Sequence, residues 1–250
     1  MEGVHISLKA EELTRLFGIP ITNTLLMTFL VSAIVISIAF LVRRRLTLIP
    51  GRFQALFEFA IGGAYDYVAD VLGDRKLAEK YFPLIATFFF FIFIGNLLYF
   101  IPGIASLGFF GTAEGHSVFT PLLRPIATDL NVTLALSIIA VIAIEIAGIT
   151  VLGFLKYGGK FVNLRSPLKF AIGIIELFSE VARFISFSFR LFGNIFAGEV
   201  ILVIVGAFIP VIIPVPLLAF ELFVGIIQAA IFALLTLFFI KVAVTDEHAA

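Results

Sequence analysis

Residues 170–209, FAIGIIELFSEVARFISFSFRLFGNIFAGEVILVIVGAFI, decide the fold. This stretch keeps a helical apolar pattern for about twice the roughly 20 residues that cross a bilayer core of about 30 Å. Pro210, Pro214 and Pro216 follow it, and a helix interior does not accept such a run. A helix of this length has to begin outside the hydrocarbon core or tilt across it. The sequence therefore predicts one long, tilted membrane span.

Four further stretches are apolar enough to cross a membrane. The chain of 250 residues is 61% hydrophobic and 14% charged, whereas a soluble domain is roughly 45–50% apolar and about 25% charged. We predict an all-α membrane protein, with residues 1–250 as a single polytopic membrane domain. Its five transmembrane helices are expected at about residues 21–42, 83–101, 130–155, 170–209 and 217–240.

Two segments between the spans differ in composition. Residues 51–80 mix charges with apolar side chains at helical spacing, from Phe53 to Ala64, which predicts an amphipathic helix at the membrane interface. Pro83 is expected to open the second span after it. Residues 103–129 are rich in Gly, Pro, Ser and Thr and are predicted to form a loop outside the hydrocarbon layer.

The composition excludes several classes of chemistry. The chain has no cysteine, its three histidines are scattered, and it carries no nucleotide-binding or hydrolase motif. Its 17 basic and 17 acidic residues cancel, so nothing favours nucleic acid as a partner. We expect no catalytic residue, no cofactor and no metal site.

The positions of the cations predict the orientation. Most of them lie on one side of the predicted spans, and by the positive-inside rule this side is the cytoplasm or matrix. The N-terminus is then outside and the C-terminus inside. Lys9, Arg15 and Arg124 lie on the outer side, and the inner cations are Arg43, Arg44, Arg45, Arg52, Arg75, Lys76, Lys80, Lys156, Lys160, Arg165, Lys169 and Lys241.

Charged groups inside the predicted spans each cost roughly 2.5–3.5 kcal/mol at a helix centre. Arg190 shares a helix face with Asn194, whereas Glu199 is nine residues further on and lies on nearly the opposite face. On the last span Glu221 and Gln228 share a face. Two interpretations remain open here: Arg190 is a structural cation paired within the bundle, or it is a fixed charge on an ion route.

Several blocks of sequence resemble subunit a of F-type ATP synthases. The most specific is SFRLFGNIFAGE at residues 188–199, and the others follow in the family's order along nearly the whole chain. They are ITNT at 21–24, PGRFQ at 50–54, YFPLI at 81–85, GNLL at 95–98, IPG at 101–103, ATDLNVT at 127–133 and Gln228-Ala229.

The resemblance implies roles for five residues. Arg190 matches the family's essential arginine, which faces the rotor ring of c subunits and separates two aqueous half-channels. Asn194, Glu199, Glu221 and Gln228 match positions that line or shape these half-channels. One common family pattern has a Glu/His pair where this chain has Glu199 and Glu221. Two nearby carboxyl groups cannot easily both ionise, so one of them is expected to hold a proton.

Other polar residues have simpler interpretations. Asp129 and Asn131 are expected to cap the third span, with a place at a channel mouth as the alternative. Glu176, Glu180 and Arg183 are expected to form pairs at i,i+3 and i,i+4 spacing. Glu145 has no clear family counterpart, and we interpret it as a channel-lining group or a partner of Arg183.

The resemblance also implies partners and a location. The partners are the c-subunit ring, the peripheral-stalk b subunits, the remaining F0F1 subunits and the lipid bilayer, and the chain itself would be non-catalytic. We expect protons as the coupling ion and a bacterial inner membrane, with the mitochondrial inner membrane as the alternative. A secondary transporter would show paired repeats, and an intramembrane hydrolase would need catalytic groups within the spans; we find neither in the sequence.

Overall fold

The computed structural model describes residues 10–44, 46–47, 49–101, 104, 107–113, 116–161, 166–209 and 212–245. Helices dominate these ranges, and two short hairpins and one 3-10 turn complete them. The helices are α1 (Asn23–Arg44), α2 (Arg52–Leu72), α3 (Arg75–Tyr99), α4 (Leu130–Leu152), α5 (Phe154–Phe161), α6 (Pro167–Phe208) and α7 (Pro214–Val244). The other elements are β1 (Glu12–Leu16), β2 (Ile19–Thr22), β3 (Gly108–Ala113), β4 (His116–Pro121) and the turn η2 (Ile126–Thr128).

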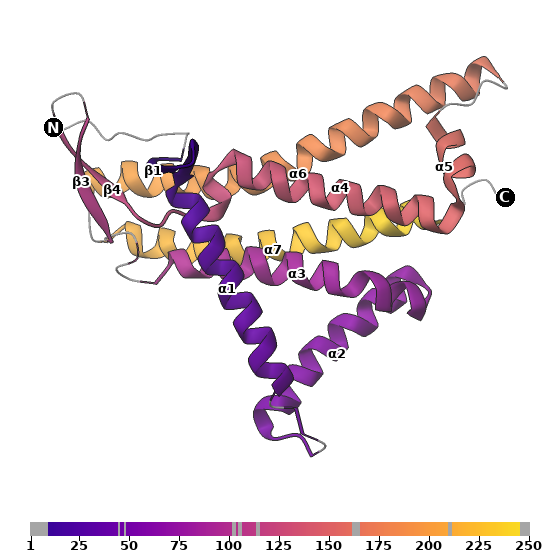
Figure 1. The fold of residues 1–250 in the computed structure, drawn as a ribbon, viewed down its shortest axis with the longest axis horizontal. Coiled ribbons are helices and arrows are strands. Elements are labelled where there is room, and N and C mark those ends of the chain that lie inside the picture. Colours follow the sequence, from indigo (N-terminus) through magenta and orange to yellow (C-terminus); the bar gives the residue numbers. More distant parts are fainter. Residues whose placement is uncertain are drawn as a thin grey trace.

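Five of the helices are long and apolar enough to cross a membrane: α1, α3, α4, α6 and α7. The prediction of an all-α membrane fold is therefore confirmed. Figure 1 shows α3, α4, α6 and α7 running roughly side by side, with α1 crossing them steeply. Helix α7 packs against α2, α3, α4 and α6, whereas α1 packs mainly against α3. The last helix of the chain is thus the centre of the bundle.

The division between the interfacial helix and the second span lies elsewhere than predicted. Instead of one helix over 51–80, α2 ends at Leu72 and α3 begins at Arg75. Gly73 adopts φ +73° between them, a conformation that glycine reaches without steric cost. Asp74 then caps α3, because its carboxylate accepts a hydrogen bond from the Lys76 N–H at 2.7 Å. Pro83 lies inside α3 rather than at its start.

The ends of the bundle hold structure that the sequence pattern did not reveal. The predicted loop over 103–129 contains the antiparallel hairpin β3–β4 and the turn η2, and β1 and β2 form a second antiparallel hairpin before α1. The third span ends at Leu152 instead of 155, because Gly153 turns the chain with φ +83° into the short helix α5. Figure 1 shows the hairpins at one end of the bundle and α5 at the other.

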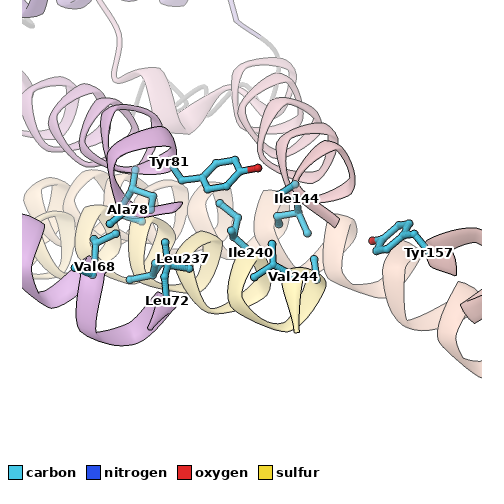
Figure 2. Packing of buried hydrophobic residues seen from close by; sticks show 14 residues of the cluster. Val68, Leu72, Ala78, Tyr81, Ile144, Tyr157, Leu237, Ile240 and Val244 are labelled. Carbon is cyan, nitrogen blue, oxygen red and sulfur yellow. The ribbon is translucent and has the colours of Figure 1, made fainter. Parts of the chain in front are cut away.

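The largest group of buried apolar side chains joins α2, α3, α4 and α7. Leu72, Ala78, Ile144, Leu237 and Ile240 belong to it, and Figure 2 shows them between the helices. The Lys241 Nζ donates a hydrogen bond to the Leu72 carbonyl oxygen at 2.8 Å, so the end of α2 is tied to the end of α7. Lipid is as apolar as these side chains, so close packing rather than the hydrophobic effect holds the helices together.

Helix α5 lies against the first turns of α6 because Gly173 lets it approach. A Cβ atom placed on Gly173 would lie 2.3 Å from the carbonyl oxygen of Phe161, the last residue of α5. This atom belongs to the backbone, so it cannot rotate away as a side chain could. The glycine therefore fixes how closely α5 and α6 pack.

We predict that Gly173→Ala lowers the free energy of unfolding by about 1–3 kcal/mol, the usual cost of overpacking. Gly62→Ala in α2 is the matched control, because a Cβ there meets nothing within 4 Å and alanine favours the helix by roughly 0.5–1 kcal/mol. Loss of helical circular dichroism on heating the purified protein in detergent measures both. Equal stability of the two variants would contradict the close approach.

Candidate functional site

Arg190 lies near the middle of α6, on a face that none of the described residues covers. Its side chain is exposed, and among the described residues no carboxylate forms an ion pair with it. The neighbouring exposed positions along α6 recur every three or four residues, so they form one continuous stripe. This row of residues, which we call the α6 stripe, comprises Ser186, Phe189, Arg190, Asn194, Ala197 and Ile201.

The opposite face of α6 packs against α4, α5, α7 and η2. Residues buried there include Leu191 and Ile195, each one position beyond a member of the stripe. The helix thus has one face inside the bundle and one face with nothing against it. A guanidinium group cannot lose its proton at ordinary pH, so the open face carries a permanent positive charge.

Glu199 forms an ion pair within the bundle. Its carboxylate accepts a hydrogen bond from Arg124 Nη2 at 3.2 Å, and the Arg124 side chain is only 8% exposed. Arg124 comes from the segment between β4 and η2, which the sequence placed in an outer loop. The structure therefore brings a loop cation and a membrane carboxylate together, a contact that the sequence did not predict.

Glu221 lies beside this ion pair. Its residue is 4% exposed, and neither carboxylate oxygen has a hydrogen-bond partner in the described part of the chain. A Cβ atom on Gly198 would lie 2.5 Å from Glu221 Oε1, so the carboxyl group rests against the α6 backbone next to Glu199. The two glutamates are therefore neighbours, as the family resemblance implied. Gly198 makes room for this side chain from α7.

Glu11, the residue before β1, lies at this end of the bundle. Asn23, at the start of α1, donates a hydrogen bond from its Nδ2 to Glu11 Oε2 at 3.3 Å. Burial raises the pKa of Glu11, the nearby Arg124 opposes this rise, and Glu199 adds to it. Glu11, Arg124, Glu199 and Glu221 thus form one group of interacting charges, which we call the outer cluster.

The remaining residues singled out from the sequence lie apart from the ion pair. Asn194 is exposed on the α6 stripe, and Gln228 is buried in α7 at 7% exposure. Asp129 caps α4, as predicted, because its carboxylate accepts from the Asn131 N–H at 2.9 Å. It also accepts a hydrogen bond from the Thr24 hydroxyl at 2.7 Å, which ties α4 to α1. Asn131 itself is exposed.

A second group of charges lies toward the other end of α6. Arg183 pairs with Glu180 at the predicted i,i+3 spacing, and Lys160 of α5 pairs with Glu176. The Arg183 guanidinium also lies 4.0 Å from the centre of the Phe239 ring. Glu145 of α4 interacts electrostatically with Glu180 and Arg183. Glu145 therefore lies near Arg183, which was one of its two suggested partnerships. The ion pair of Arg183, however, is with Glu180.

Comparison of the sequence with known proteins shows the family of this chain. The sequence model of the ATP synthase A chain family matches residues 25–241. The chain belongs to this family. Among its relatives, the ATP synthase subunit a of Moorella thermoacetica is 32% identical over 229 residues, which cover 92% of this chain and 94% of the relative.

Two other members of the ATP synthase A chain family show the range of the likeness. The ATP synthase subunit a of Mycobacterium ulcerans is 35% identical over 232 residues, covering 91% of this chain and 88% of the relative. A protein of Propionigenium modestum named "ATP synthase subunit a, sodium ion specific" is 34% identical over 233 residues, covering 93% and 77%. Membership of the family makes the chain a component of the membrane sector of an ATP synthase.

Sequence reasoning missed three side chains that shape these clusters. Arg124 entered the sequence analysis only as a topology signal, although it is the single Lys or Arg of residues 103–129 and stands beside Pro125, which was a usable signal. Glu11 lies before the first predicted span, and Tyr157 lies in a short segment that carries too little periodicity to predict a helix. Their relevance comes from contacts between segments far apart in the chain.

We predict that Arg124 and Glu199 are energetically coupled. Arg124→Gln and Glu199→Gln should each lower stability, because each removes their ion pair while the charge that is left stays poorly solvated. The double variant should recover part of the loss, with a coupling energy of about 0.5–3 kcal/mol. Unfolding by denaturant in mixed detergent micelles, applied to all four members of the cycle, measures this value.

The exposed ion pair of Arg15 and Glu12 is the matched control. Its side chains are 69% and 32% exposed, and a pair of this kind couples by only about 0–1 kcal/mol. Additive losses at Arg124 and Glu199 would show that their contact contributes nothing to stability.

Proposed function

We propose that this chain is the ion-conducting stator subunit of an F-type ATP synthase, with Arg190 as the fixed charge between two half-channels. The observation that carries this proposal is the α6 stripe. It holds an unpaired arginine on an uncovered face of a membrane helix, where a lone charge is costly. A carboxylate on a neighbouring subunit that passes this face would pair with the guanidinium, which explains why the described part of this chain offers it no ion-pair partner.

The positions of the other charges support two separate routes. Glu199 lies nine residues beyond Arg190 and Glu180 ten residues before it. At 1.5 Å per residue these separations are about 14 Å and 15 Å along the helix axis. The outer cluster and the group around Glu180 therefore lie on opposite sides of Arg190, and a permanent cation between them opposes direct passage of a proton.

The residues act in this scheme as follows. Glu199 and Glu221 pass a proton from the outer side toward the rotor carboxylate, and Asn194 and Gln228 shape the route further along α6 and α7. Arg190 attracts the deprotonated rotor carboxylate, and its own proton is never released. The rotor then carries each proton round before releasing it toward the inner side. Each charge that crosses 100 mV supplies about 2.3 kcal/mol, which the barrier at Arg190 directs into rotation.

The assembly and location follow from the same proposal. The chain performs no bond chemistry itself, and it works with the c-subunit ring, the peripheral-stalk b subunits and the remaining F0F1 subunits. The bias of cations places the N-terminus outside and the C-terminus in the cytoplasm of a bacterial inner membrane. Asp129 and Asn131 then lie at the outer mouth. The proton is the proposed coupling ion, and one relative named sodium ion specific makes Na⁺ the comparison to test.

We predict that Arg190→Ala in the assembled complex abolishes coupled proton pumping and ATP synthesis while passive proton conduction persists. The reason is that the two half-channels lose the charge that separates them. ATP-driven acidification of inverted membrane vesicles measures pumping, and decay of an imposed pH gradient after removal of the soluble sector measures passive conduction.

Arg15→Ala serves as the control for loss of an arginine, because Arg15 is exposed and paired with Glu12 outside the spans. It should leave both readouts unchanged. Repeating the measurement with and without Na⁺ identifies the coupling ion. Normal ATP synthesis in the Arg190→Ala complex would sink the proposal.

A further inference from the structure

A second group of polar side chains lies on the inner side of Arg190. It consists of Glu145 of α4, Tyr157 of α5 and the ion pair of Glu180 and Arg183 on α6. The residue roles proposed above do not use this group. We call it the inner cluster. A cleft of about 390 Å³ opens beside it. Glu145 and Glu180 are the ionisable residues that line this cleft. The rest of its lining is apolar and consists of Val141, Phe161, Leu177, Val181 and Phe184.

Two polar atoms of the inner cluster are buried and belong to side chains that interact with each other. Tyr157 is 3% exposed, its hydroxyl oxygen and Glu145 Oε1 are both buried, and the Tyr157 and Glu145 side chains interact. Figure 2 shows the Tyr157 hydroxyl directed back toward α4, the helix that carries Ile144 and therefore Glu145. Burial raises the pKa of Tyr157, and the Glu145 carboxylate raises it further, so this hydroxyl remains a hydrogen-bond donor.

The charges of the inner cluster do not balance. The charged groups that act on Glu145 are Glu180 and Arg183, so two carboxylates face one guanidinium. Glu180 is 9% exposed, and an unbalanced charge in such a place is expensive. One added proton makes the cluster neutral, and the second carboxyl group is the place where it can bind.

We propose that Glu145 and Glu180 together hold one proton, with Tyr157 donating a hydrogen bond to the carboxylate that remains ionised. This carboxyl pair is a proton-holding station between the α6 stripe and the inner surface. The next charged groups toward that surface are Glu176, one turn earlier on α6, and its partner Lys160 on α5. Only the direction of proton transfer, toward the inner side, rests on the proposed function.

A carbodiimide that partitions into lipid, dicyclohexylcarbodiimide, tests where the proton is held. The proton of a carboxylic acid moves to one nitrogen of the reagent and the carboxylate oxygen bonds to its central carbon, so no other reactant is needed. Membranes that contain the assembled complex are treated at neutral pH, and mass spectrometry of peptides from this chain locates the adduct. Within this cluster we expect one adduct, at Glu145 or Glu180, and none at Glu176; an adduct at Glu199 or Glu221 would report on the outer cluster and is counted separately.

Single substitutions test whether the two carboxyl groups share the proton. In Glu145→Gln or Glu180→Gln, Arg183 balances the one carboxylate that is left, so labelling of that group should fall several-fold. Arg183→Gln removes the balancing charge and should add a second adduct. Tyr157→Phe removes only the donor to the ionised carboxylate and should increase labelling. Glu58→Gln in α2, far from this cluster in the chain, is the control and should change nothing.

Proton pumping tests the role of the station. Each glutamine variant should pump several-fold more slowly, and the double variant no more slowly than either one, because the pair acts as a unit. Three results would overturn the proposal. The first is that wild-type membranes show no adduct at Glu145 or Glu180. The others are that the remaining glutamate of a single variant is labelled as strongly as in the wild type, or that the variants pump protons at the wild-type rate. Labelling of the carboxyl groups does not depend on the coupling of proton flow to rotation. If Arg190→Ala left that coupling intact, the proposed function would fail, but the labelling result would still stand.

Discussion

The cost of placing a charge in hydrocarbon organises this molecule. Between Glu176 and Glu199, α6 carries five charged side chains, and four of them have a partner in the bundle or on α5. Two of the pairings hold another segment against α6: Arg124 holds the segment before η2 and Lys160 holds helix α5. Glu180 and Arg183 pair within α6 itself. Arg190 is the one that the described residues leave unpaired. The face of α6 that packs in the bundle thus also carries the paired charges, whereas the exposed face carries the unpaired Arg190.

The sequence predicted the long spans well because length and apolar composition are local properties. It located the five membrane helices, the capping role of Asp129 and the pairing of Glu180 with Arg183, since each depends on residues within a few positions of each other. The predicted boundary between α2 and α3 was wrong because it relied on Pro83 as the start of a helix. The observed boundary lies at Gly73 and Asp74. A proline can be accommodated within a membrane helix, whereas a left-handed glycine followed by an N-cap ends one helix and starts the next.

The contacts that build the two clusters could not be predicted in the same way. Glu199 meets Arg124 across 75 positions of sequence, and Tyr157 reaches Glu145 through a helix only eight residues long. Hairpins β1–β2 and β3–β4 also escaped notice, because short strands at the end of a bundle lack a long apolar pattern. Family resemblance supplied Arg190 and its neighbours, but it gave no position for residues such as Glu145 that have no clear counterpart.

The central place of α7 has a consequence for how the protein is made. Helices α2, α3, α4 and α6 all pack against it, yet a ribosome delivers it after every one of them. The earlier helices enter the lipid before the helix that most of them contact, and Glu199 is made before its neighbour Glu221. Helix α7 therefore completes the packing of the bundle only after the helices around it have been made.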